Sequence, residues 1–310
     1  MKKALILGGN GFIGRRLTSE LAKDHIVTVA DINIQNEHKI DGVSYVLFDF
    51  VKETNFDELI HNVDVIFHLV CTILPEDGTS DFDQDIKDNL FSTIRFLDSM
   101  KDFPNKKLYF MSSGGTVYGN DSNVQKEDDA TFPICKYGIV KCIIEKTLEL
   151  YHIMHGLSYC VIRLANPYGA RMRKGQRQGV IPILVDSVLH NKEFYLWGDG
   201  ENVRDYIHIE DMISAVRLLM KYDGEERIFN LGSGKGHTIN AVIKILESYI
   251  GQPYDKLVHK PSRLCDVRSS VLDISRLTER TSWKPQISLE EGILSILKEY
   301  DHHVNEEGDV

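Results

Sequence analysis

Three glycines near the start of the chain constrain the fold more than any other feature. They lie in the segment GGNGFIG at residues 8–14, which follows an apolar stretch and opens an amphipathic one. In such a loop one glycine permits a tight turn, one lets the backbone approach a pyrophosphate, and one lets a helix pack on a strand. The N–H groups at the helix start attract phosphate. Dinucleotide binding is therefore predicted for Gly8, Gly11, Phe12, Ile13 and Gly14.

Short apolar runs alternate with longer amphipathic segments through the first half of the chain. This alternation predicts strands at 4–7, 26–30, 43–48, 63–69, 107–111 and 159–164, with helices at 12–23, 82–100 and 135–155. Such an order implies right-handed crossovers and an α/β fold with a Rossmann-type, doubly wound parallel sheet. The nearly continuous apolar strands suit a sheet that helices cover on both faces.

The pattern changes after about residue 170. We expect a dinucleotide-binding domain over residues 1–170 and a smaller α/β substrate-binding lobe over 171–310, some of whose segments return to the first domain. Helices are predicted at 181–190, 210–221, 239–250 and 289–300, and strands at 194–197 and 227–231. Four Arg or Lys residues and three glycines at 169–179 predict a mobile, phosphate-facing loop, and the polar residues 302–310 are expected to fray.

The charge and the cysteines exclude several classes of protein. Lys and Arg number 36 and Asp and Glu number 46, so the net charge of −10 argues against general nucleic-acid or anionic-membrane binding. No apolar run approaches the ~20 residues that cross a bilayer, and the glycine loop cuts the apolar start short of an export signal. Five cysteines without CxxC spacing, and histidines without a metal pattern, lead us to expect a cytoplasmic, reduced, metal-free protein.

Asp31 closes the second predicted strand and bears on the choice of dinucleotide. A carboxylate there would accept hydrogen bonds from the adenosine ribose and repel a 2′-phosphate. No Arg or Lys follows until Lys39, so NAD is expected rather than NADP. The alternative is that Asp31 merely caps the strand end. Asp49, after the third strand, is expected to accept a hydrogen bond from the adenine amino group.

Tyr137 and Lys141 stand four residues apart in a predicted helix, which puts both on one face. An ammonium beside a phenol favours the phenolate and is expected to lower the phenol pKa from about 10 towards neutrality. Such a tyrosine can take the proton of a sugar hydroxyl while hydride leaves the same carbon. The spacing alone is common by chance, but here it follows the fifth strand and the loop SSGGTVYG at 112–119.

Several separated motifs together resemble the NAD-dependent epimerase/dehydratase family of extended short-chain dehydrogenases, and within it the 4-epimerase branch. Over about residues 2–300, the motifs are GGNGFIG at 8–14, SSGGTVYG at 112–119, Pro133-x-x-x-Tyr137-x-x-x-Lys141, RLANPYG at 163–169, RDYIH at 204–208 and RLCDV at 263–267. The resemblance implies that Tyr137 is the catalytic acid–base, and that Lys141 tunes it and binds the nicotinamide ribose.

One position departs from the family pattern. Gly114 stands where the family usually carries a Ser or Thr whose hydroxyl bridges the sugar and the tyrosine. Thr116 is our first choice for the missing relay, and Ser113 is the second. The alternative is that both hydroxyls only shape the loop. The carboxylates that drive elimination or decarboxylation in related enzymes are absent at Gly115 and Thr116, which disfavours both reactions.

The resemblance also assigns the residues that would bind a nucleotide-diphosphate sugar. They are Arg204, Arg263 and Asn166 for the diphosphate, Trp197 for stacking on the base and Asp266 for the nucleotide ribose. Ser270 matches a position that gates sugar size, where a small side chain leaves room for an N-acetyl group. Asn89 matches an asparagine near the nicotinamide, although a purely structural amide fits equally well.

The expected activity is that of an NAD-dependent nucleotide-sugar 4-epimerase acting through a transient 4-keto sugar. The alternatives are a 4-keto-sugar reductase or sugar-nucleotide dehydrogenase using the same residues, and a non-catalytic NAD sensor, which the intact Tyr137 and Lys141 disfavour. The helices at 82–100 and 135–155 carry long apolar stripes, so a homodimer joined by a four-helix bundle is expected.

Overall fold

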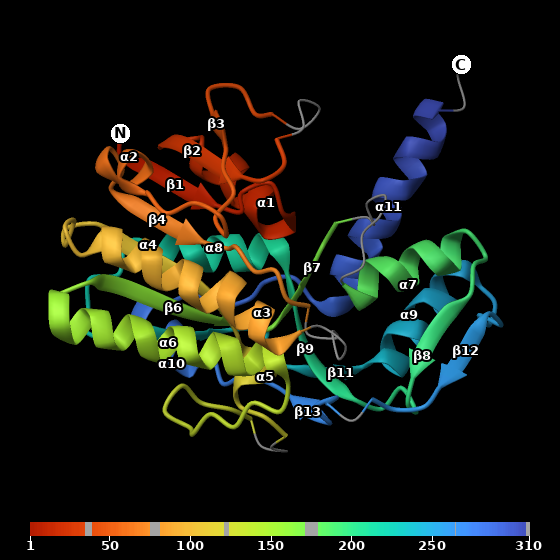
Figure 1. Cartoon of the computed structure of the whole chain (residues 1–310). Coiled ribbons are helices and arrows are strands. Elements are labelled where there is room, and N and C mark those ends of the chain that lie inside the picture. The colour runs from red at the N-terminus through yellow and green to blue at the C-terminus, as the bar shows by residue number, and fades with distance from the viewer. Residues whose placement is uncertain (35–38, 75–80, 121–123, 171–178, 264, 308–310) are drawn as a thin grey trace. The chain divides into compact units, whose positions relative to one another are not determined.

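The computed structural model describes residues 1–34, 39–74, 81–120, 124–170, 179–263 and 265–307, with side chains up to residue 300. Over these residues the chain forms two compact units. Figure 1 shows the elements of both, coloured by residue number along the chain. The first unit comprises Met1–Val117, Pro133–Arg163 and Gly224–Phe229; the second comprises Tyr118–Phe132, Leu164–Asp223 and Asn230–Val310. The chain changes unit at several points. The expected domains, 1–170 and 171–310 with later segments returning to the first domain, stay a prediction.

The described helices and strands follow the chain in this order. The first part contains β1 Lys3–Leu7, α1 Phe12–Leu21, β2 Ile26–Asp31, β3 Ser44–Leu47, α2 Asp57–His61, β4 Val65–His68, α3 Phe82–Ile86, η2 Lys87–Phe91, α4 Ser92–Met100, β5 Lys107–Ser113, α5 Gly114–Val117, α6 Lys136–His155 and β6 Ser158–Leu164. The second contains β7 Asn166–Tyr168, α7 Val180–Leu189, β8 Phe194–Trp197, β9 Val203–His208, α8 Ile209–Leu219, β10 Ile228–Leu231, β11 Gly236–Thr238, α9 Ile239–Ile250, β12 Leu257–Lys260, β13 Ser269–Ser270, α10 Ser275–Thr281 and α11 Leu289–Glu307.

The first unit is built on a sheet whose strand order is β3-β2-β1-β4-β5-β6-β10, seven strands within the described residues. The chain starts in the middle, at β1, which pairs in parallel with β2 on one side and β4 on the other. The order of a doubly wound sheet reverses at this point, and ligands bind beyond the carboxyl ends of its strands there. The α/β, Rossmann-type fold expected from the sequence is therefore confirmed.

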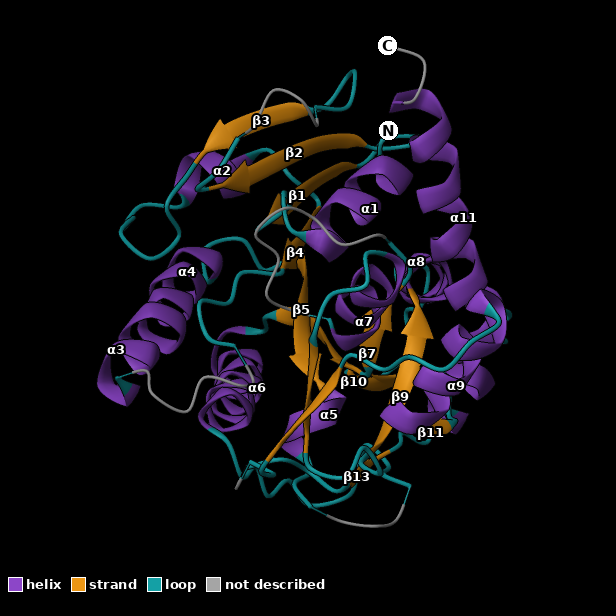
Figure 2. Cartoon of the chain, turned by 90° about the vertical axis from the view of Figure 1, so that its right-hand side faces the viewer, coloured by secondary structure: helices purple, strands orange, loops and turns teal. Residues whose placement is uncertain are grey.

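Helices cover both faces of this sheet, with α1 on one face and α4 and α6 on the other (Figure 2). The core between strands and helices is apolar: Ile66 and Phe110 from the sheet belong to the same buried cluster as Phe96 of α4 and Leu148 of α6. Gly156 caps the C-terminal end of helix α6. Its φ of 71° is left-handed, a backbone conformation that residues with a side chain rarely adopt.

The predicted helix at 82–100 is interrupted by the π-helical turn η2. In this turn Asn89 Nδ2 donates to the carbonyl of Asp85 at 2.8 Å, and Thr93 Oγ1 donates to the carbonyl of Asn89 at 2.6 Å. Side-chain donors thus bond main-chain carbonyls of this helix, which is how local polar groups compete with regular helical bonding. The spacing of apolar residues, from which this helix was predicted, does not reveal such a turn.

The second unit contains the small sheet β11-β9-β13, with β7 also paired to β9, and the parallel pair β8–β12. Its own apolar core joins α7, α9 and α11, for example through Leu184, Val242 and Ile293. Strands of two or three residues such as β7 and β13 carry too little pattern to be predicted. Helix α11 continues to Glu307, beyond the predicted end at 300, and most of the predicted loop at 169–179 lies outside the described residues.

The described helices include none that is both long and apolar enough to span a membrane. Within the same residues, no group of three or more His, Cys, Asp or Glu side chains is arranged to hold a metal ion. None of the five cysteines, all of which lie in the described residues, forms a disulfide.

Candidate active site and nucleotide-binding residues

The glycine loop joins β1 to α1 with its backbone closely packed. Gly8 has a φ of +78°, and its N–H donates to the carbonyl of Ala30 at 2.9 Å. A Cβ on Gly14 would lie 2.5 Å from the Cα of Gly9, so only glycine fits there. Gly11 precedes α1 and offers no side-chain cap, which leaves the first N–H groups of the helix to a phosphate. The loop therefore fits the pyrophosphate of a dinucleotide.

Asp31, at the end of β2, holds the glycine loop through backbone hydrogen bonds. Its Oδ2 accepts from the N–H of Asn10 at 2.9 Å, and its Oδ1 accepts from the N–H of Asn33 at 3.0 Å. Asp31 can therefore cap the strand end and still accept hydrogen bonds from a ribose, because each of its carboxylate oxygens keeps a second lone pair.

Arg15 was not among the residues expected at the site. Its Nε donates to the backbone and side-chain oxygens of Asn10, both at 2.8 Å. Burial lowers the pKa of Arg15, and the nearby Asp31 carboxylate acts in the opposite direction. In the sequence, Arg15 could have been found as the first basic residue after the glycine loop. This cation reduces the charge that Asp31 presents to a dinucleotide.

Asp49 lies in the turn after β3. It accepts from the N–H of Val51 at 3.1 Å and pairs with Lys52 at 3.0 Å. The side-chain hydrogen bond from Lys52 is the largest effect that lowers the pKa of Asp49. The carboxylate is therefore ionised at neutral pH, and its expected contact with adenine stays a prediction.

Tyr137 and Lys141 lie at the start of α6 against the end of β5. Lys141 is buried, its Nζ donates to the carbonyl of Met111 at 2.8 Å, and the same atom lies 5.4 Å from the centre of the Tyr137 ring. The side chain of Ser113 hydrogen-bonds the Tyr137 phenol. Phenol, ammonium and hydroxyl are thus brought together within one unit.

The pKa of Tyr137 differs from the sequence expectation. Burial raises it, and this effect outweighs the lowering by the Ser113 hydrogen bond; burial also lowers the pKa of Lys141. The expectation counted the charge of Lys141 but not the desolvation of both groups, which disfavours phenolate and ammonium alike.

The two hydroxyls considered as replacements for the missing family Ser or Thr differ in their contacts. Ser113 bonds the Tyr137 phenol, whereas Thr116 Oγ1 is buried and has no hydrogen-bond partner among the described residues. The backbone at Thr116 packs against Gly138 of α6, where a Cβ would lie 2.6 Å from the Thr116 carbonyl oxygen. Ser113 thus has the contact that a relay requires, and Thr116 has an unsatisfied hydroxyl.

The side-chain amide of Asn89 forms its hydrogen bonds with other residues of the protein. Its Oδ1 accepts from the N–H of Thr72 at 2.9 Å, and its Nδ2 donates to Thr72 Oγ1 at 2.7 Å as well as to Asp85. These bonds fasten the segment after β4 to η2. The geometry therefore favours the structural reading of this amide.

In the second unit, Arg204 and Asn166 lie on the paired strands β9 and β7. Arg204 Nη1 donates to the carbonyl of Val203 at 2.9 Å, and Asn166 Nδ2 donates to the carbonyl of Asp205 at 3.0 Å. Burial lowers the pKa of Arg204, while the nearby Tyr206 and Asp266 act against it. Three predicted substrate residues, Asn166, Arg204 and Asp266, thus come from neighbouring segments of this unit.

Trp197 and Arg263 contact each other directly. The guanidinium carbon of Arg263 lies 4.3 Å from the centre of the Trp197 ring, and Trp197 is 41% exposed. An exposed indole beside a guanidinium suits both stacking on a base and binding of phosphate. Ser270, the predicted gate for sugar size, is buried in β13 opposite Arg204 of β9.

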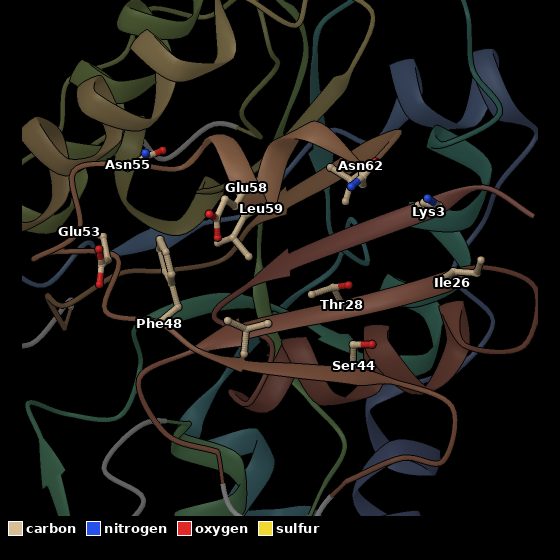
Figure 3. Close-up of a pocket in the computed structure, with 12 residues that line it drawn as sticks. Lys3, Ile26, Thr28, Ser44, Phe48, Glu53, Asn55, Glu58, Leu59 and Asn62 are labelled. Carbon is tan, nitrogen blue, oxygen red and sulfur yellow. The ribbon is translucent and has the colours of Figure 1, made fainter.

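A hollow of about 720 Å³ opens on the first unit beside β2, β3 and α2 (Figure 3). Thr28, Ser44, Phe48 and Glu58 are among its lining residues, and the predicted site residues are not. The hollow also reaches Lys3, which begins β1, whereas the glycine loop follows the other end of that strand. It is therefore a separate feature from the predicted dinucleotide site.

Proteins of known activity resemble this chain over nearly its whole length. The dTDP-4-dehydro-6-deoxyglucose reductase of Escherichia coli is 30% identical over 305 residues, covering 95% of this chain and 96% of the reductase. The UDP-glucose 4-epimerase of Mycolicibacterium smegmatis is 30% identical, covering 94% and 96%.

Solved structures lead to the same group of enzymes. The UDP-glucose 4-epimerase of Thermotoga maritima, solved with UDP-glucose, superposes with a TM-score of 0.89 at 32% identity, over 97% of this chain and 99% of the epimerase. The Thermus thermophilus UDP-glucose 4-epimerase, solved with NAD, gives 0.87 at 26% identity, over 96% and 99%.

The sequence pattern of one family matches residues 4–232, which include the glycine loop, Tyr137 and Lys141. Together with the doubly wound sheet and the site on β5 and α6, this match determines the family and its dependence on NAD. The chain belongs to the NAD dependent epimerase/dehydratase family.

Proposed function

We propose that this protein is an NAD-dependent nucleotide-sugar 4-epimerase that acts on a UDP-sugar of the glucose/galactose or N-acetylhexosamine type. The observation that carries the proposal is the arrangement of Ser113, Tyr137 and Lys141, with a hydroxyl bonded to the phenol and an ammonium 5.4 Å from its ring. The similarity to UDP-glucose 4-epimerases along the whole chain supports the substrate class.

The residues around the glycine loop would hold the cofactor: the N–H groups that begin α1 for the pyrophosphate, Asp31 for the adenosine ribose and Lys141 for the nicotinamide ribose. When bound, oxidised NAD supplies a hydride acceptor that can return the hydride, and a positive ring that favours a nearby phenolate.

The chain's own residues manage the proton. Tyr137 Oη takes the proton of the sugar C4 hydroxyl as the C4–H bond breaks and the 4-keto group forms. Ser113 orients the phenol, and Lys141 stabilises the phenolate. After the keto sugar has turned over, Tyr137 returns the proton to the C4 oxygen as hydride re-adds to the opposite face. Arg204, Arg263 and Asn166 hold the diphosphate, Trp197 the base and Asp266 the nucleotide ribose.

A 4-keto-sugar reductase is the second candidate, because the E. coli relative of that activity is as similar as the epimerases. Gly114 also removes the hydroxyl that the family usually places between sugar and tyrosine. A reductase would use Tyr137 to protonate the C4 oxygen and would consume one reduced cofactor in each turnover.

One assay separates the two candidates. The purified protein is incubated with UDP-, dTDP- and GDP-sugars without added cofactor, and new isomers are sought by chromatography. An epimerase forms a 4-epimer while its bound NAD is retained. Turnover that requires added reduced dinucleotide, with stoichiometric oxidation, would replace the epimerase proposal by the reductase.

We also propose that two copies associate through α6 and the α3–η2–α4 segment. Apolar side chains are exposed there, among them Phe91 at 48%, Leu150 at 50% and Ile153 at 73%. Burying such a surface against its copy gives a four-helix bundle. Sedimentation at micromolar concentration should report a dimer, and Leu150→Asp should yield a monomer; a monomeric parent protein would contradict the proposal.

The five cysteines, none of which forms a disulfide, support a reducing, cytoplasmic location. Fractionation of the source cells tests this, because recovery in an exported fraction would contradict it.

A further inference from the structure

The end of β5 and one face of α6 are fastened to each other at three successive points. The carbonyl of Met111 binds Lys141, the Ser112 hydroxyl binds Glu145, and the Ser113 hydroxyl binds Tyr137. Adjacent strand residues thus engage helix residues spaced four apart. The second of these contacts uses Glu145, which lies one helical turn beyond Lys141 and takes no direct part in the chemistry described above.

Glu145 is part of a buried ion pair. Its side chain is 4% exposed and that of Arg163 on β6 is 5% exposed; Arg163 Nη2 lies 2.7 Å from Glu145 Oε2, and Arg163 Nε lies 3.1 Å from the same atom. The Ser112 hydroxyl donates to the other carboxylate oxygen. A buried carboxylate stays ionised only where such partners offset its desolvation.

The charge of Glu145 reaches Lys141. Burial lowers the pKa of Lys141, while Cys71 and Glu145 act to raise it. Within the described residues, Lys141 also faces the ring of Phe110, 4.7 Å from its Nζ, and His68. Burial lowers the pKa of His68 to about 3, so this imidazole is neutral and adds no positive charge beside the ammonium.

We propose that Glu145 is a positioning residue whose carboxylate supports the Lys141 ammonium and keeps it in register with Tyr137, and that Arg163 holds this carboxylate in place. The inference rests on the proposed function of Tyr137 and Lys141. The pair Glu145–Arg163 as a whole is neutral, but its negative end lies on the same helix face as Lys141. Removing Glu145, or removing the Arg163 that holds it, should therefore act on Lys141 in the same direction.

The test is the alkaline limb of the pH profile of kcat/KM, where loss of the Lys141 proton abolishes activity. Glu145→Gln should move this limb to lower pH by about one unit, because the ammonium loses its carboxylate. Arg163→Met should move the limb in the same direction, because the carboxylate loses the guanidinium that holds it in place beside Lys141. Neither variant moving the limb, or Arg163→Met moving it to higher pH, would reduce the pair to a structural role.

Two further variants guard against a folding defect. Glu145→Asp keeps the charge but shortens the side chain, so kcat should fall while the alkaline limb stays at its original pH. The double variant Glu145→Gln with Arg163→Met buries no unpaired charge and should still show the lowered limb. A double variant whose limb matches the parent protein would contradict the proposal.

The second unit provides a matched control. There Glu127 is buried, and its Oε2 lies 3.7 Å from Arg276 Nε. Glu127→Gln should reduce stability without moving the limb. The pH dependence of NAD binding, measured without sugar, provides a second readout on Lys141. Failure of the parent protein to convert any sugar nucleotide would contradict only the proposed function, whereas an unshifted NAD-binding profile in Glu145→Gln would contradict this inference.

Discussion

The predicted catalytic residues and the predicted nucleotide-binding residues differ in how firmly contacts within the protein hold their side chains. Tyr137 and Lys141 in the first unit are held by Ser113 and by the carbonyl of Met111, and Lys141 is buried. In the second unit Trp197 is 41% exposed, and its described contact with Arg263 is a stacking one. Proton transfer requires groups positioned before the substrate arrives, whereas binding residues can complete their contacts with the ligand.

The elements that carry the residues explain this difference. Tyr137 and Lys141 project from the long helix α6 onto a strand in the interior of the large sheet. Trp197 ends the four-residue strand β8, and Arg263 lies after β12. We therefore expect substitutions in the first group to lower kcat, and substitutions in the second group to weaken binding of the nucleotide.

The largest effect is expected from Tyr137→Phe. Loss of the phenolic oxygen removes the acid–base group, which should cut kcat by about 10³-fold. NAD content of the purified protein should stay unchanged, as measured by absorbance after denaturation. Tyr151→Phe is the matched control on α6, because the Tyr151 hydroxyl bonds Asp98 at the surface. Turnover within tenfold of the parent protein would remove Tyr137 from the proposed mechanism.

The next effect separates Ser113 from Thr116. Ser113→Ala should lower kcat by about 10²-fold, because it removes the hydroxyl bonded to Tyr137. Steady-state kinetics of Thr116→Val provides the comparison, since this change removes only a hydroxyl that has no partner among the described residues. A large loss in Thr116→Val with full activity in Ser113→Ala would assign the relay to Thr116, as first expected from the sequence.

In the second unit, Arg204→Met should weaken binding of UDP by about tenfold, because a charged hydrogen bond to phosphate is lost. Calorimetry with UDP alone measures this without any chemistry. Arg268→Met is the control, since Arg268 is exposed and pairs with Asp199 at 3.0 Å. A fall in kcat with unchanged UDP affinity would contradict the assignment of catalysis to residues of the first unit and of nucleotide binding to residues of the second.

The smallest effect concerns the dinucleotide. Asp31→Asn removes the charge and keeps an acceptor oxygen, so the preference for NAD over NADP should narrow by a few-fold; Arg15 already offsets part of that charge. Asp31→Ala should also weaken NAD binding, because the N–H groups of Asn10 and Asn33 lose their acceptor. Fluorescence titration with both dinucleotides measures the ratio. Tighter binding of NADP than NAD by the parent protein would reject the preference.

The sequence by itself determined the doubly wound sheet, the glycine loop and the pair Tyr137 and Lys141. These depend on local pattern: apolar runs of strand length, glycines at positions that admit no Cβ, and a spacing of four on a helix. Residues close in the sequence have a geometry that secondary structure alone dictates, and so they could be named in advance.

Only the tertiary structure decided which hydroxyl contacts Tyr137, that burial raises the pKa of that phenol, and that Glu145 and Arg163 form a pair. It also brought Arg15 next to Asp31 and Arg263 onto Trp197. Each of these joins segments that are separate in the chain. Burial and charge proximity depend on how those segments pack, which no local pattern records.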